Sequence, residues 1–232
     1  MTDGQLDGPV EGRLSRATAQ RLSQYLRGLG SGARHGGTVS SDELAQSVQV
    51  SAAQVRRDLA ALGHLGQRGV GYDVAGLATA IRRTLGIDRP WRAVLVGVGN
   101  LARALLKYQA FRDQGFTIVA LFDADPAKLG QTVEGLPVEP ATALPRRLAE
   151  VGAELAVLTV PSHAAQGIAD VLTAAGIRGI MNFAPANLRT PPAVQVVTVD
   201  LAIQLEQLAF LVQLAAGSES VVGPRPGPLE RG

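Results

Sequence analysis

Residues 93–102 read AVLVGVGNLA, and this stretch decides the fold of the larger part of the chain. Four apolar residues, typical of a buried strand, run directly into a G-x-G-x-x-A turn that opens a helix. In such a turn Gly97 permits the tight bend, Gly99 lets a pyrophosphate approach the backbone, and Ala102 lets helix and strand pack closely. The phosphates would lie at the N-terminus of that helix. The stretch therefore predicts a Rossmann-type nucleotide-binding turn.

The chain after Trp91 alternates strand and helix patterns. Apolar runs that favour strands occupy residues 93–96, 117–122, 155–160, 178–183 and 194–199. Helical patterns separate most of them, which predicts an α/β fold with a parallel sheet. The last helical segment, 201–214, is apolar on nearly every side, and such a helix has to be buried all round.

The second predicted strand ends in Asp123, about twenty residues after the glycine turn. A carboxylate there would accept hydrogen bonds from the adenosine ribose hydroxyls and would repel a 2′-phosphate. We therefore predict that the cofactors are NADH and NAD+ and not their phosphorylated analogues. The alternative is a tight β-α turn with a helix-capping aspartate.

Two later loops are candidates for the nicotinamide half of the site. Thr159, Val160 and Pro161 end one predicted strand, while Asn182 and Phe183 end the next. Ligands in open α/β folds bind beyond the carboxyl ends of the strands, so either loop is a candidate wall for the nicotinamide. Alternatively, the prolines only terminate strands. We expect the following histidine, His163, to cap the helix or face solvent, and not to act as an acid.

The N-terminal part reads as a helix-turn-helix with a wing. Helical spacing predicts one helix from the apolar face that begins at Leu14, and cap residues at Ser40 and Ser51 predict two more. The third, over residues 52–62, turns Val55, Leu59 and Leu62 inward and Gln54, Arg56, Arg57 and Asp58 outward. The glycine-rich stretch after it, GHLGQRGVGYDV, favours a tight hairpin.

Charge and composition narrow the function. Residues 13–89 hold eleven arginines against five acids, whereas residues 91–232 hold eleven bases against twelve acids. A basic N-terminal part attracts polyanions, although arginine-rich composition alone also produces it. The absence of cysteine excludes disulfides, Fe–S clusters and thiolate metal sites, so any redox role uses a bound cofactor. No apolar run approaches a membrane span and the first residues lack a secretory signal, so we expect a cytoplasmic protein without membrane or metal partners.

These patterns predict five segments. They are a disordered N-terminus (1–12), a winged-helix DNA-binding domain (13–88), a Rossmann domain (89–200), a C-terminal dimerisation helix (201–216) and a disordered tail (217–232). The basis for the two disordered ends is their glycine, proline and polar content.

The motifs together resemble the Rex family of redox-sensing repressors over about residues 13–215. The resemblance rests on QVRRDL and RGVGY before VGVGNLA, and on LFDADPAKLG, LTVPSHAAQ, NFAP and VDLAIQLEQL after it. It implies a homodimer that binds an inverted-repeat operator when NAD+ is high and releases it when NADH accumulates.

The resemblance also implies roles for individual residues. The cofactor-binding set is Gly97, Val98, Gly99, Asn100, Leu101, Ala102, Tyr108, Asp123, Thr159, Val160, Pro161, Asn182 and Phe183. The DNA-binding set is Ser41, Gln54, Arg56, Arg57, Arg68 and Gly69. The switch that would link DNA-binding domain, nicotinamide and partner subunit is Arg27, Tyr108 and Asp200.

This chain departs from the family pattern at two positions. Arg57 stands where the family often has lysine, and Leu201 stands where some members have phenylalanine, which puts an aromatic contact on the nicotinamide in doubt. From the residues alone, Arg56 and Arg57 also fit a solvated helix face, Arg27 an ordinary surface arginine and Tyr108 the edge of a core.

Two rival functions follow from the same fold. An NAD-dependent oxidoreductase needs a proton donor near the nicotinamide, but the chain has three histidines, no Tyr-x-x-x-Lys pair, no cysteine and no substrate domain after residue 200. A nucleotide-binding regulatory subunit without DNA affinity would not need the QVRRDL helix and its wing. We therefore predict a repressor and not an enzyme.

Overall fold

The computed structural model describes residues 14–30, 37–63, 66–67 and 69–219, with side chains up to residue 215. The chain forms two compact units, one of Met1–Trp91 with Phe111–Gly115 and one of Arg92–Ala110 with Phe116–Gly232. Within the described ranges, no helix combines the length and the apolar character that crossing a bilayer requires.

The first unit is a small helical domain with one core. Its helices are α1 (Arg16–Leu29), α2 (Ser41–Val48), α3 (Ala52–Ala60) and α4 (Val74–Thr84). The predicted caps are confirmed, because Ser40 forms a capping box with Glu43 and Ser51 accepts a bond from the Gln54 amide. Sequence analysis did not predict α4, which contributes Leu77 and Ile81 to the core.

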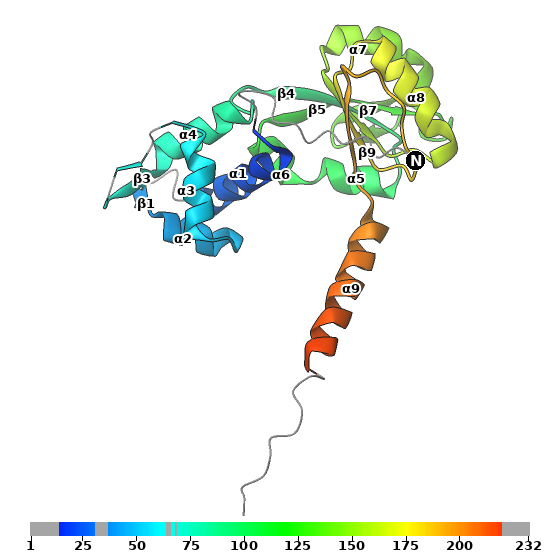
Figure 1. Ribbon diagram of the computed structural model, residues 1–232. Coiled ribbons are helices and arrows are strands. Elements are labelled where there is room, and N and C mark those ends of the chain that lie inside the picture. The colour runs from blue at the N-terminus through cyan, green and yellow to red at the C-terminus, as the bar shows by residue number, and fades with distance from the viewer. Residues whose placement is uncertain (1–13, 31–36, 64–65, 68, 220–232) are drawn as a thin grey trace, which may run out of the picture. The chain divides into compact units, whose positions relative to one another are not determined.

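A three-stranded antiparallel sheet forms the predicted wing. Its strands β1 (Thr38–Val39), β2 (Gly66–Gln67) and β3 (Gly71–Asp73) lie in the order β1-β3-β2. Figure 1 labels β1 and β3. Gly71 has a φ of +100°, and a Cβ there would lie 2.5 Å from the Val39 carbonyl oxygen. Only glycine fits this position. Helices α2 and α3 with this sheet confirm the winged helix-turn-helix.

Asp58 does not face outward as predicted from its polarity. It is one of the buried residues of α3, together with Val55 and Leu59. The prediction was wrong because partners on α1, which helical spacing does not reveal, compensate the buried carboxylate: Arg21 and Tyr25 both donate hydrogen bonds to it.

The second unit is built on a seven-stranded sheet in the order β10-β9-β8-β4-β5-β7-β6. The strands are β4 (Trp91–Val96), β5 (Phe116–Asp123), β6 (Thr132–Val133), β7 (Leu136–Pro140), β8 (Leu155–Leu158), β9 (Gly179–Asn182) and β10 (Gln195–Thr198). Without the short antiparallel edge strand β6, this is the 3-2-1-4-5-6 order of a dinucleotide-binding sheet. The strand order reverses between β4 and β8, where such folds bind their ligand.

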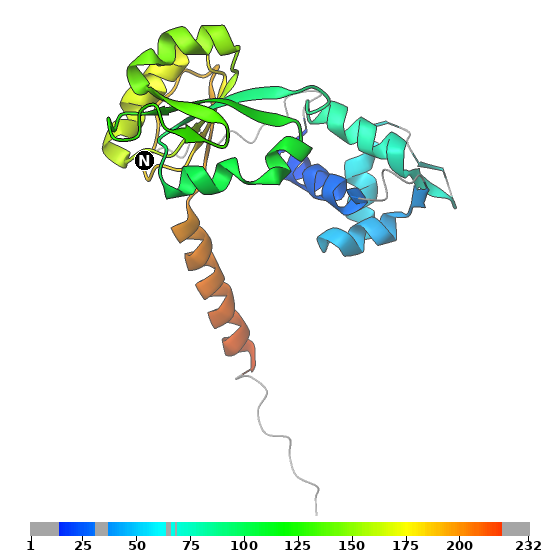
Figure 2. The same ribbon diagram turned by 180° about the vertical axis from the view of Figure 1, so that it is seen from behind.

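Helices cover both faces of this sheet (Figures 1 and 2). They are α5 (Asn100–Leu106), α7 (Leu144–Val151, after a 3-10 turn at Ala141–Ala143) and α8 (Ser162–Ala174). The short helix α6 (Gln109–Asp113) follows α5 and buries no residue. Alternate β4 residues enter different cores: Val94 and Val96 pack with α7 and α8, while Leu95 packs with α5. The predicted Rossmann-type parallel sheet is thus confirmed.

Sequence analysis missed β6 and β7 and misplaced several strand ends. Strand β7 reads LPVEP, in which only Val138 is buried, so it lacks the apolar run that marks the other central strands. Strand β8 ends at Leu158, and Thr159 and Val160 lie in the loop beyond it.

The C-terminal helix α9 (Leu201–Glu219) extends beyond the predicted end at residue 216. Every described side chain from 201 to 215 is exposed, including Leu205 at 67% and Phe210 at 60%. The expectation that this helix is buried all round does not hold within one chain, since the described residues provide no surface that covers it.

Candidate functional site

The glycine turn follows β4 and lies where the strand order of the sheet reverses. Gly97 has a φ of +94°, and a Cβ there would lie 2.6 Å from the Thr159 carbonyl oxygen. The Thr159 hydroxyl donates to the Gly97 carbonyl oxygen at 2.6 Å. Two crossover loops are thereby held in contact, and a side chain at residue 97 would separate them.

The second glycine of the turn borders open space. A Cβ added at Gly99 would have no protein atom within 4 Å, and Gly99 caps α5 without a side-chain hydrogen bond. Backbone amides at the start of α5 therefore face a space that a phosphate group would fill. This geometry fits a dinucleotide pyrophosphate at the turn.

The Asp123 carboxylate ties the glycine turn to the loop after β5. Its two oxygens accept bonds from the amides of Val98 (2.7 Å) and Asp125 (2.9 Å) and from the Lys128 ammonium (2.9 Å). Burial raises the pKa of Asp123, but these three donors outweigh it and hold the pKa below its usual value. An ionised carboxylate has about four acceptor positions, so one is left for a ribose hydroxyl.

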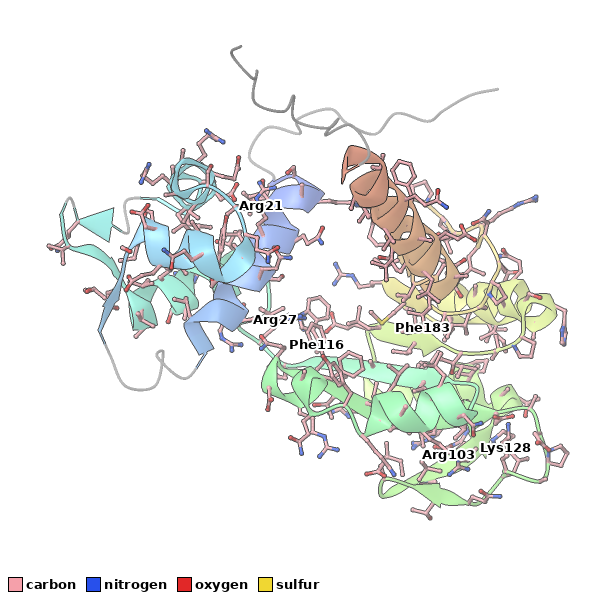
Figure 3. All side chains as sticks on the ribbon, turned by 90° about the horizontal axis from the view of Figure 1, so that it is seen from below. Arg21, Arg27, Arg103, Phe116, Lys128 and Phe183 are labelled. Carbon is pink, nitrogen blue, oxygen red and sulfur yellow. The ribbon has the colours of Figure 1, made fainter. Side chains whose placement is uncertain are left out.

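Lys128 is a functional candidate that sequence analysis missed. Its ammonium lies beside Asp123, where a 2′-phosphate would otherwise meet an uncompensated negative charge. On the same side of this loop, Arg103 of α5 donates to the Gln131 side chain at 3.3 Å (Figure 3). Asp123 alone therefore does not set the charge of the part of the site that would hold the adenosine half of the cofactor.

Asn182 shapes its own loop. Its amide nitrogen donates to the carbonyl oxygens of Ala184 and Ala186, and its side-chain oxygen accepts from the Ala184 amide. The side chain is completely buried. The described geometry thus gives Asn182 a role in fixing the loop that carries Phe183, and leaves it no exposed polar atom for a ligand.

Three further predicted residues of this unit are surface groups, whereas Val98 and Ala102 of the glycine turn are buried. His163 is exposed in the first turn of α8, and Tyr108, after α5, is 52% exposed. Asp200 caps α9, where its carboxylate accepts from the amides of Ala202 (2.9 Å) and Ile203 (3.3 Å). Arg27 is exposed on α1 of the first unit, so the three switch residues are not brought together within either unit.

The predicted DNA-binding residues fall into two groups on the first unit. Ser41, Arg56 and Gly69 line one groove of about 690 Å³ between α2, α3 and the wing. Gln54 and Arg57 lie apart from that groove and bond to each other, with the Arg57 guanidinium donating to the Gln54 side-chain oxygen at 2.6 Å. Arg68 lies outside the described residues.

Two family models match the chain: "CoA binding domain" over residues 88–186 and "Putative DNA-binding protein N-terminus" over residues 13–60. The redox-sensing transcriptional repressor Rex of Rhodopirellula baltica is 46% identical over 90% of this chain and 89% of its own length.

Two solved structures of a Rex-family repressor are similar over 90% of this chain. One is RSP with NAD+ and operator DNA (30% identity, 99% of that chain, TM-score 0.81). The other is RSP with NADH (28% identity, 98% of that chain, TM-score 0.79).

Proposed function

Because this chain belongs to the Rex family of redox-sensing transcriptional repressors, we propose that it binds operator DNA through its winged helix and releases it when NADH occupies the second unit. The observation that carries this proposal is the pairing of a recognition helix bearing Arg56 and Arg57 with a glycine turn whose open side fits a pyrophosphate. Each of these two features belongs to a single unit.

The residues of the second unit would bind the cofactor and read its redox state. The bound nicotinamide supplies two oxidation states that differ by one hydride and one positive charge. Backbone amides from Gly99 onward would hold the pyrophosphate, Asp123 would accept from a ribose hydroxyl, and the Phe183 loop would border the nicotinamide. We infer a regulatory role and not catalysis, because the relative that is 46% identical is named a transcriptional repressor.

The first unit would read the operator by two routes. Arg57 and Gln54 on α3 would contact base edges in the major groove, which specify sequence. Ser41 and Gly69, which line the groove on this unit, would contact the phosphate backbone, which fixes position. The family resemblance implies the same backbone contact for Arg68, which lies outside the described residues.

We further propose that the working form is a cytoplasmic homodimer held by α9 on an inverted repeat. Eight large apolar side chains of this helix are exposed in one chain, and a second copy would cover them. Operator half-sites one helical turn apart lie about 34–36 Å from each other. A rotation between the subunits would therefore move the two winged helices out of register with the two half-sites. Arg27, Tyr108 and Asp200 would transmit that rotation.

A gel shift tests the function directly. The operator is the duplex that the full chain enriches from a randomised pool, and its affinity is measured with NAD+ and with NADH. We expect NADH to weaken binding at least about tenfold, since a switch needs differential affinity for two states. Arg27→Ala and Asp200→Ala should bind NADH as the parent does but release less DNA. Equal operator affinity with both nucleotides in the parent would refute the proposed switch.

Cofactor choice gives a second test at Asp123 and Lys128. Asp123→Ala leaves the Lys128 ammonium with only the more distant Asp125 carboxylate, at 3.9 Å, so the preference for NADH over NADPH should fall about tenfold. Lys128→Gln should raise that preference, because Asp123 then repels a 2′-phosphate unopposed. Calorimetric titration of both nucleotides measures the ratio. An unchanged ratio in both variants would show that this pair does not select the cofactor.

A further inference from the structure

A buried carboxylate lies directly behind the proposed DNA-reading side chains. Asp58 is 4% exposed and accepts four hydrogen bonds. Arg21 of α1 donates two of them, at 2.6 and 2.7 Å, and the Tyr25 hydroxyl donates a third at 2.8 Å. The fourth comes from the Gln54 amide nitrogen on α3, at 2.9 Å.

This arrangement fixes which end of the Gln54 amide faces inward. An ionised carboxylate only accepts hydrogen bonds, so the nitrogen of Gln54 turns toward Asp58 and its oxygen turns away. The Gln54 oxygen in turn accepts from the Arg57 guanidinium at 2.6 Å. A chain of bonds thus runs from α1 through Asp58 and Gln54 to the exposed Arg57.

The orientation restricts what Gln54 can read. Recognition of adenine by glutamine uses both ends of the amide, with the nitrogen donating to N7 and the oxygen accepting from the N6 amino group. Asp58 and Arg57 each occupy one hydrogen-bonding position of this amide, so one N–H and one acceptor position remain for a base. These remaining positions fit the N7 and N6 groups of adenine, and the Arg57 guanidinium fits the acceptor edge of guanine.

We propose that Asp58 is a positioning residue that sets operator specificity by fixing the Gln54 amide and, through it, the Arg57 guanidinium. This inference rests on the proposed function, because it assigns a cause to the base reading by α3. Arg21 and Tyr25 of α1 donate hydrogen bonds to Asp58 and not to Gln54.

Asp58→Asn tests this bond chain from Asp58 through Gln54 to Arg57 while it preserves the size of the side chain. Asparagine has one acceptor oxygen, for which Arg21 and Tyr25 compete, so its amino group is left facing Gln54. Gln54 then turns over and directs donors at Arg57. We expect the ratio of operator to non-operator affinity to fall about tenfold, and less than about twofold in a Gln54→Ala background, since one bond chain carries both effects.

Tyr25→Phe is the matched control. It removes one bond from Asp58 without freeing the carboxylate from Gln54, so the melting temperature should fall while the specificity ratio stays within about twofold. Two results would overturn the proposal that Asp58 acts through Gln54. One is that the effects of Asp58→Asn and Gln54→Ala on the ratio of operator to non-operator affinity add fully, and the other is that Asp58→Asn leaves this ratio unchanged. A parent chain that enriches no operator would instead refute the proposed function.

Discussion

Replacing Leu205, Leu208 and Val212 of α9 by aspartate is expected to convert the protein to a monomer and to lower operator affinity by about two orders of magnitude. These side chains are 56–67% exposed in one chain and follow one helix face. Each buried leucine contributes about 1.5–3 kcal/mol to association, and three charges at the same place oppose it. Light scattering after gel filtration measures the mass, and a gel shift measures the affinity.

The polar residues of the same helix provide a control. Gln204, Gln207 and Gln213 changed together to aspartate add the same charge to α9 but remove no apolar side chain. This variant should keep most of its dimer and its operator affinity. A fully dimeric apolar-face variant with parental affinity would show that α9 is not the interface.

The affinity loss follows from the geometry of two linked half-sites. Once one winged helix is bound, the second binds at a high effective concentration, and overall affinity exceeds that of one domain without any new contact. Loss of the dimer removes this gain in overall affinity and leaves each recognition helix intact. The monomer should therefore keep its base preference on a single half-site while its affinity falls.

The predictable parts of the fold are those with local signals. The glycine turn, the apolar strands and the serine caps each depend on residues a few positions apart. Helix α4 carried such a signal as well, because Val74, Leu77, Ala78 and Ile81 recur at helical spacing. Strand β7 had none, since it depends on parallel pairing with β5 and not on its own composition.

The site was less predictable because its polar groups find partners far along the chain. Asp58 bonds to Arg21, 37 residues away, so polarity alone placed it on the wrong side of α3. Asn182 had the expected residue type for a ligand contact, but its loop uses all of its hydrogen-bonding groups. Lys128 was overlooked because a lysine five residues after Asp123 has meaning only once the loop folds back.

Two glycine substitutions should separate the fold of the nucleotide turn from its ligand. Gly99 has an ordinary φ of −93°, and a Cβ there meets no protein atom, so Gly99→Ala should leave the melting temperature unchanged. The same methyl group enters the space proposed for the pyrophosphate, and NADH affinity should fall about tenfold to a hundredfold. Operator binding should persist and no longer respond to NADH.

Gly97→Ala should lose NADH by another route. Its Cβ would lie 2.6 Å from the Thr159 carbonyl oxygen at a φ of +94°, so we expect a loss of stability of about 1–3 kcal/mol in addition to lost binding. Gly167→Ala in α8 is the control, because its Cβ meets no atom and alanine favours the helix. Calorimetric NADH titration beside thermal unfolding separates the two effects. If Gly99→Ala binds NADH as tightly as the parent, the pyrophosphate does not approach the backbone there, and the open space beside α5 belongs to another ligand or to solvent.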